Sequence, residues 1–173
     1  MAGSLIKIDE EIVTSAVASV TLTGIDSTYD VYMVRVNKWE TQIDARTPYM
    51  RFTVSGTDDT SANYDRAFKF LDATATFANG ASTNQTQIQI SANIGTSGNE
   101  FLNGVFYLFN FNNASEYSFV TGEMTGRDTG AGLFGGQGGA VLTVAQATDG
   151  VTFFLSSSTN IAGGTFTLYG LKK

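Results

Sequence analysis

The chain has no cysteine and no histidine among its 173 residues. Without thiols and imidazoles it has no Cys or Ser–His nucleophile system, no Cys/His zinc site and no histidine pH switch. Most enzyme mechanisms are thereby excluded, so we expect a protein that binds without catalysing a reaction and that uses no cofactor and no metal. A domain of this length buries about 70% of the surface of its unfolded chain, so stability does not require a disulfide.

Charged residues are also scarce, at 15% of the chain, with 10 Lys and Arg against 16 Asp and Glu and a net charge of −6. This balance has the wrong sign for neutralising phosphates, so we expect no nucleic-acid partner. Long apolar runs are missing: Val105–Phe111 is too short to cross a bilayer, and Met1–Ile8 lacks the pattern of a signal peptide. We expect a soluble chain with no membrane partner, made in a reducing cytoplasm.

Alternation of apolar and polar residues with a period of two runs through most of the chain and predicts an all-β fold. Tyr49–Val54 is typical, with Met50, Phe52 and Val54 on one face. We find neither a linker nor an internal repeat, so we expect one domain over residues 1–173, an antiparallel β-sandwich of jelly-roll-like form with about ten strands. The predicted strands are Leu5–Ile8, Ile12–Thr23, Val31–Val36, Tyr49–Val54, Arg66–Phe77, Gln85–Ala92, Leu102–Phe111, Tyr117–Met124, Ala140–Ala145, Val151–Leu155 and Thr165–Leu171.

Two aromatic residues fall in segments that the pattern predicts to be loops. Trp39 lies in Asn37–Pro48, which shows no clean period, and Tyr64 lies in the polar segment Ser55–Asp65. An aromatic face in a loop can stack on a sugar ring or anchor a protein contact. Packing of the ring onto the nearby sandwich surface is the alternative.

Glycines are concentrated in a segment predicted as a turn, Gly126–Gly139, and a second turn is predicted at Asn79–Asn84. Gly130–Gly135 matches the Gly-x-Gly-x-x-Gly pattern of dinucleotide sites, but a strand-like run follows it where such a site needs a helix. We therefore interpret the segment as a β–β loop that is either a subunit contact or a mobile tip. The residues of this predicted contact loop are Gly130, Gly132, Gly135, Gly136, Gly138 and Gly139.

Acidic side chains are grouped in two places, and neither has the spacing of a known site. Asp58, Asp59, Asn63 and Asp65 carry oxygen ligands of the kind that Ca²⁺ accepts, but residues of this type are also common in turns that they cap themselves. We expect a solvated turn there. Glu116, Glu123 and Asp128 could in principle supply a pair of catalytic carboxylates, yet nothing fixes their separation, and we interpret them as exposed charges.

Four stretches resemble short structural proteins from the virions of tailed bacteriophages. They are Gly24–Tyr32 (GIDSTYDVY), Ser61–Asp65 (SANYD), Gly104–Phe111 (GVFYLFNF) and Gly164–Lys172 (GTFTLYGLK). The resemblance implies a virion location and a non-enzymatic β-sandwich subunit that decorates or cements the head or belongs to the tail-fibre and adsorption apparatus. It implies as partners other virion proteins of the capsid or tail, and a host surface glycan if the protein serves adsorption.

Two predicted strands, Val31–Val36 and Val105–Phe111, are apolar on both faces. A strand of this kind needs cover on both sides, which predicts a homo-oligomer. The alternative function is a carbohydrate-binding β-sandwich module, with Trp39, Tyr64 or the glycine-rich segment forming the sugar platform.

Overall fold

The computed structural model describes residues 4–73, 77–130 and 132–171, and these form thirteen strands and one short 3-10 turn, η1. None of these residues belongs to a helix with the length and apolar character that a membrane span requires. The elements are β1 Leu5–Val13, β2 Ser19–Leu22, β3 Val31–Thr41, β4 Pro48–Val54, β5 Thr57–Asp58, β6 Tyr64–Asp72, β7 Ala78–Gln85, β8 Ile88–Gln89, β9 Leu102–Phe109, β10 Ser118–Arg127, β11 Leu133–Leu142, β12 Gly150–Leu155, η1 Ser156–Ser158 and β13 Ile161–Leu171.

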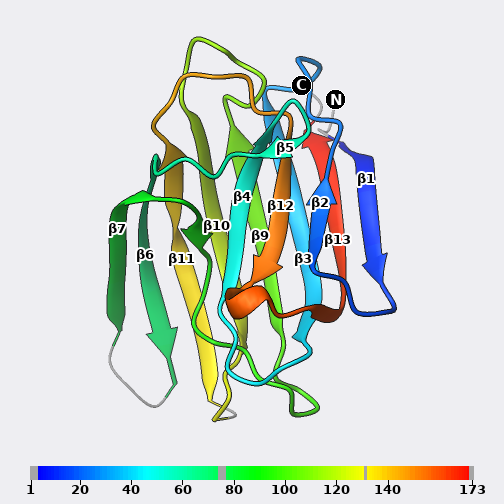
Figure 1. The fold of residues 1–173 in the computed structure, drawn as a ribbon, viewed down its shortest axis with the longest axis vertical. Coiled ribbons are helices and arrows are strands. Elements are labelled where there is room, and N and C mark those ends of the chain that lie inside the picture. The colour runs from blue at the N-terminus through cyan, green and yellow to red at the C-terminus, as the bar shows by residue number, and fades with distance from the viewer. Residues whose placement is uncertain (1–3, 74–76, 131, 172–173) are drawn as a thin grey trace.

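The strands form two antiparallel sheets that pack face to face, which confirms the predicted β-sandwich. The larger sheet has eight strands in the order β1-β13-β3-β9-β10-β11-β6-β7, and the smaller has the order β2-β12-β4-β5 with β8 also paired to β4. In Figure 1 the smaller sheet lies in front of the middle of the larger one, and Leu5 at the start of β1 pairs with Leu171 at the end of β13.

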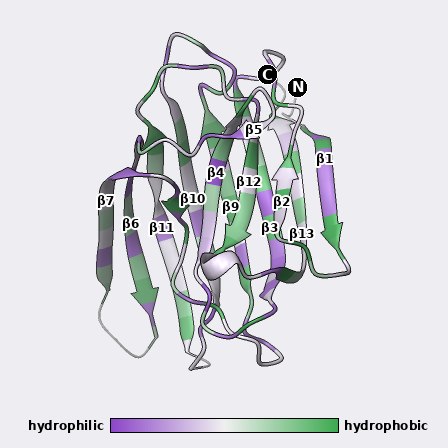
Figure 2. Cartoon of the chain, in the orientation of Figure 1, coloured by the Kyte–Doolittle hydropathy of each residue, from purple (hydrophilic) through white to green (hydrophobic). Residues whose placement is uncertain are grey.

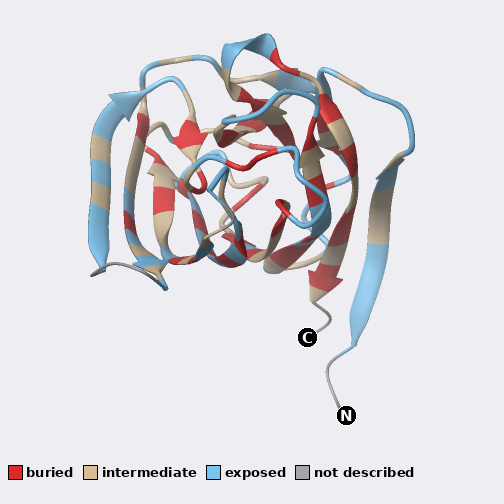
Figure 3. Cartoon of the chain, turned by 90° about the horizontal axis from the view of Figure 1, so that it is seen from below, coloured by how far each residue is buried: buried red, intermediate tan, exposed pale blue. Residues whose placement is uncertain are grey.

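The core fills the space between the two sheets because alternate residues of each strand face inward. In β4 the inward residues Met50 and Phe52 are buried, and β12 places the buried Phe153 against them from the neighbouring strand. Figure 3 shows buried segments in the centre of the sandwich and exposed strands, β1 and β7, at its two sides. The larger sheet therefore ends in two strands that the smaller sheet does not cover.

Strand β3 lies in the interior of the larger sheet, between β13 and β9, as the apolar pattern of Val31–Val36 predicts. It also continues to Thr41, so the prediction of a loop from Asn37 is wrong. The reason is an irregularity: the pairing with β9 shifts between Val36 and Trp39, and Lys38 has a positive φ of 56°. The extra residue changes which face the following side chains occupy, and this breaks the period of two.

The glycine-rich segment forms a strand and not the predicted turn. Gly135, Gly136, Gly138 and Gly139 lie in β11, in the interior of the larger sheet between β10 and β6. The inward-facing Gly138 has Phe68 as its cross-strand partner in β6, and a Cβ at Gly138 would come within 2.7 Å of the Phe68 ring. Of these glycines, Gly138 makes room for the Phe68 ring, whereas a Cβ at Gly136 would meet the Met124 sulfur and one at Gly139 would meet the Val120 carbonyl oxygen.

The two edge strands of the larger sheet also differ from the predictions. Asn79–Asn84, predicted as a turn, belongs to β7, and Asp9–Glu11, which separates the predicted strands Leu5–Ile8 and Ile12–Thr23, belongs to β1. Figure 2 shows the hydrophilic band that these acidic residues form in the middle of β1. The pairing of β1 with β13 shifts between Lys7 and Asp9, so β1 contains a bulge where the alternation is interrupted.

Candidate interaction surfaces

Both aromatic residues that were predicted to make surface contacts lie in the core. Trp39 is 0% exposed and meets Phe153 and Phe166 edge-on, at centroid distances of 5.8 and 5.3 Å. Tyr64 is 1% exposed; its hydroxyl accepts a hydrogen bond from the Phe52 N–H and donates to the Asp59 carbonyl, both at 3.1 Å. Burial raises the pKa of the Tyr64 phenol. Neither ring can form a sugar platform, and the prediction of contacts through them is wrong.

Of the predicted contact loop, only two residues lie in a turn. The N–H groups of Gly130 and Gly132 donate to Asp128 Oδ1 at 2.9 and 2.8 Å, which closes the turn between β10 and β11. Ala131, between them, lies outside the described residues. The other four glycines of the predicted loop are in β11, so the contact loop is corrected to this short turn.

The acidic side chains of the segment 58–65 point to three different partners. Asp58 Oδ1 accepts from the Thr152 hydroxyl at 2.6 Å, Asp65 Oδ1 accepts from the Asn84 N–H at 2.9 Å, and Asp59 Oδ1 accepts from the Ser61 N–H at 2.8 Å. Burial opposes ionisation of Asp59, but the hydrogen bonds from Ser61 and from the Gln146 amide together outweigh it and lower the pKa. Among the described residues no cluster of three His, Cys, Asp or Glu side chains is arranged to hold a metal ion.

The carboxylates of the second acidic group also lie apart. Glu123 is in β10 and accepts a hydrogen bond from the Gln137 amide at 2.9 Å, whereas Asp128 closes the turn after β10. Glu116 precedes the start of the same strand, seven residues before Glu123. Glu116 lies in a bend, and the five residues of strand from Ser118 to Glu123 alone span roughly 16 Å at about 3.3 Å per residue, more than the 5–9.5 Å between the acids of a glycosidase.

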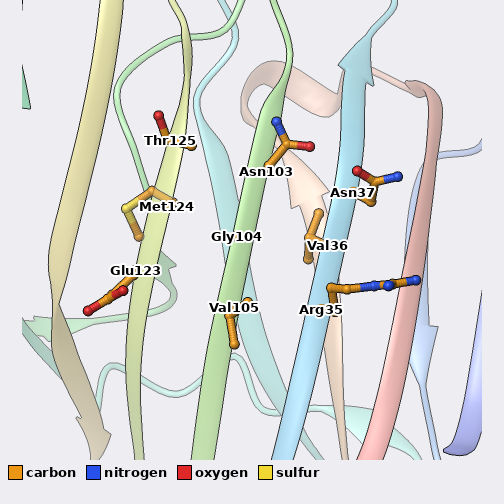
Figure 4. Close-up of a pocket in the computed structure, with 9 residues that line it drawn as sticks. All are labelled: Arg35, Val36, Asn37, Asn103, Gly104, Val105, Glu123, Met124 and Thr125. Carbon is orange, nitrogen blue, oxygen red and sulfur yellow. The ribbon is translucent and has the colours of Figure 1, made fainter.

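A wide groove of about 560 Å³ crosses the outer face of the larger sheet, over β3, β9 and β10. Figure 4 shows its floor at Val105, with Asn103 beside it, while Arg35 and Glu123 point outward to opposite sides. The Glu123 carboxylate accepts a hydrogen bond from Gln137, and the side-chain amide oxygen of Asn103 (Oδ1) accepts one from the Lys38 N–H at 3.0 Å. The groove thus offers amides and an apolar floor, with the Arg35 guanidinium and the Glu123 carboxylate at its two sides.

Exposed apolar side chains lie on the same outer face beside the groove. Tyr107 of β9 is 39% exposed and Phe119 of β10 is 42% exposed, whereas the exposed Leu133 of β11 lies at the far end of the sheet, opposite Arg127. Met33 of β3 pairs with Tyr107 and is 9% exposed. The expectation that β3 and β9 are apolar on both faces is thus met at these positions. This face is covered by no other element of the described chain in Figure 1.

The free edge of β7 is the second candidate surface. Its eight residues, ANGASTNQ, carry no charge and no proline, and most of them are exposed. The opposite edge strand, β1, carries Lys7, Asp9, Glu10 and Glu11 and contains a bulge. Charges and bulges are the usual means by which a sheet edge is kept from pairing with another strand. The β1 edge of the larger sheet is therefore protected from pairing with another strand, whereas the β7 edge has no such protection.

No family model, curated protein or solved structure matches this chain.

Neither of these surfaces was identified from the sequence alone. The β7 edge was missed because small and amide residues are typical of turns, and the outer-face groove was missed because its residues come from three strands that pair only in the fold. The sequence signal for the β7 edge is a long segment without charged residues or proline that lies between predicted strands.

Proposed function

We propose that this chain is a non-enzymatic structural subunit of a bacteriophage particle, an exposed β-sandwich on the head or in the tail-fibre apparatus, which assembles through the edge of its larger sheet. The resemblance of four stretches to virion proteins supports the proposed location in a phage particle. The unpaired β7 edge supports the proposed assembly of several copies. Alternate backbone N–H and C=O groups of an edge strand point away from the sheet and pair readily with another strand.

The observation that carries the assembly role is the contrast between the two edges. Two copies of β7 related by a two-fold axis run antiparallel and are self-complementary, with no charge facing its own copy. Two copies of β1 paired about Glu10 would place Glu10 opposite itself and Asp9 opposite Glu11, and like charges that lie opposite each other destabilise strand pairing. The β7 edge is therefore the edge that a second copy of the chain would use.

Sedimentation of matched variants tests the assembly role. Ala81 and Thr83 are exposed in β7, and the double substitution Ala81→Lys and Thr83→Lys places like charges across the two-fold pairing. The matched control adds the same charge to the other edge with Leu5→Lys and Ile12→Lys, at residues that are also exposed. We expect the first pair to give monomers at concentrations where the wild type and the control are oligomeric. A monomeric wild type at high micromolar concentration would contradict self-assembly.

Composition of purified particles tests the virion assignment separately. Mass spectrometry of phage particles that encode this chain should find it at a defined copy number relative to the major capsid protein. Absence of the chain from intact particles would overturn the assignment.

A further inference from the structure

The outer face of the smaller sheet carries a second groove, of about 530 Å³, on the side of the molecule opposite the groove of Figure 4. It lies over β2, β12 and β4 and is closed at one end by the turn η1. Volumes of roughly 300–1,000 Å³ are typical of sites for small ligands.

A ladder of aromatic and guanidinium planes forms one part of this groove. The rings of Tyr49 and Phe154, on paired strands, stack with centroids 5.7 Å apart and planes inclined at 29°. The Arg51 guanidinium lies 4.5 Å from the Phe154 ring centroid. Tyr49 and Phe154 are only partly buried, so this apolar surface faces the groove and is not part of the core.

The charges beside the ladder are already paired within the protein. Arg51 donates to the Thr86 carbonyl and to the Gln87 amide oxygen, both at 2.9 Å, and lies 3.8 Å from the Asp58 carboxylate. Asp58 in turn accepts from the Thr152 hydroxyl at 2.6 Å. An ionic ligand would have to displace these partners, so the groove favours an uncharged one. The same hydrogen bonds hold the guanidinium in place against the Phe154 ring.

Hydroxyl groups without an internal partner line the rest of the groove. Ser19, Ser157, Ser158 and the phenol of Tyr49 make no side-chain hydrogen bond to any described residue. Ser157 and Ser158 have positive φ angles of 58° and 51°, which is uncommon for two consecutive residues other than glycine. Backbone held in this region is found more often at binding sites than elsewhere.

We propose that this groove binds a neutral saccharide. A sugar ring has an apolar face of C–H groups, which packs on aromatic rings, and a rim of hydroxyls, which exchange hydrogen bonds with serine and tyrosine hydroxyls. The groove supplies both surfaces and no free charge. This inference goes beyond the proposed assembly role and uses the opposite sheet, so either can fail alone.

A glycan array that displays neutral and acidic glycans, probed with the labelled full-length chain, tests the inference. We expect binding to neutral glycans and weak or no binding to acidic ones. Calorimetry with the glycan that binds best then compares Tyr49→Ala with Tyr107→Ala, a matched removal of a partly exposed tyrosine from the other sheet. The first should lose about tenfold or more in affinity, and the second should stay within about twofold.

Further variants keep the test decisive. Tyr49→Phe retains the ring and should lose less affinity than Tyr49→Ala. If Tyr49→Ala does not fold, Ser19→Trp fills the groove from an exposed position and should abolish binding. The inference is overturned if the folded protein binds no neutral glycan, if it binds only acidic ones, or if Tyr49→Ala and Ser19→Trp leave binding unchanged. A monomer that binds neutral glycans would refute the assembly role and leave this site in place.

Discussion

Gly122 of β10 and Phe106 of β9 are cross-strand partners, and the Phe106 ring occupies the space that a side chain at Gly122 would need. A Cβ at Gly122 would lie 2.8 Å from the ring atom Cε1. On β11, the next strand, Gly138 is the partner of Gly122 and has Phe68 on its other side. Two aromatic rings thus lie over two central glycines in one row of the inner face.

Gly122→Ala should therefore destabilise the protein by about 1–3 kcal/mol, because the added methyl group forces the buried Phe106 ring out of its position. Gly98→Ala is the control: a Cβ there meets nothing within 4 Å, so the substitution should be neutral or slightly stabilising. Urea denaturation measures both. Equal stability of the two variants would show that the position of the Phe106 ring does not depend on the absence of a side chain at Gly122.

Tyr64→Phe should cost about 1–3 kcal/mol, since it leaves the Phe52 N–H and the Asp59 carbonyl without their shared partner in a buried place. Tyr107→Phe removes the same hydroxyl from a partly exposed tyrosine and should change stability by less than about 0.5 kcal/mol. The difference between the two midpoints of chemical denaturation checks the prediction. A neutral Tyr64→Phe would show that these two hydrogen bonds contribute little to stability.

The sequence predicts the fold class well because most strands keep a regular alternation that depends on neighbouring residues alone. Tyr49–Val54 and Val151–Leu155 are examples in which the predicted segment coincides with the observed strand to within one residue. The predicted strand Gln85–Ala92 is the opposite case. Its first residue, Gln85, ends β7, and of the remaining residues only Ile88–Gln89 form a strand.

The errors arise where a strand depends on a distant partner. Trp39 was placed in a loop because the bulge at Lys38 reverses the alternation, and the bulge is defined by pairing with β9, more than sixty residues away. The glycines of β11 resemble a turn in isolation, and only their neighbours on β6 and β10 explain why a strand contains them, with Phe68 against Gly138 and Met124 against Gly136. Each of the two grooves is lined by residues from several strands that are distant in the sequence, so no local sequence pattern predicts either groove.

Acid should remove a part of the stability that depends on Asp59. Its pKa in the folded protein lies below the ordinary value of 3.8, so the charged form favours the fold. The contribution is complete above about pH 4 and is lost as the pH falls through the lowered pKa. Asp59→Asn should therefore lose stability at pH 7 and show a weaker decline below pH 4, as measured by urea denaturation. Glu116→Gln, which removes an exposed carboxylate, is the control, and it should follow the wild type.

Chelation should leave the protein unchanged. Asp58, Asp59 and Asp65 are each engaged by a hydroxyl, an amide or a backbone N–H, so their carboxylates do not converge. The melting temperature should be the same in EDTA and in added Ca²⁺, because a ligand that binds only the native state would raise it. A loss of several degrees in EDTA that Ca²⁺ reverses would point to a calcium site in this segment.

The difference between the β1 and β7 edges also sets a limit on size. If two copies join at β7 as proposed, the combined sheet has β1 at both of its ends, and a third copy would find no uncharged edge of that sheet to extend. Pairing is therefore self-terminating and gives a closed unit instead of a filament. The charges of Lys7, Asp9, Glu10 and Glu11 then prevent further strand pairing at the ends of the combined sheet. Their replacement by uncharged residues would convert an oligomer of defined size into an open polymer.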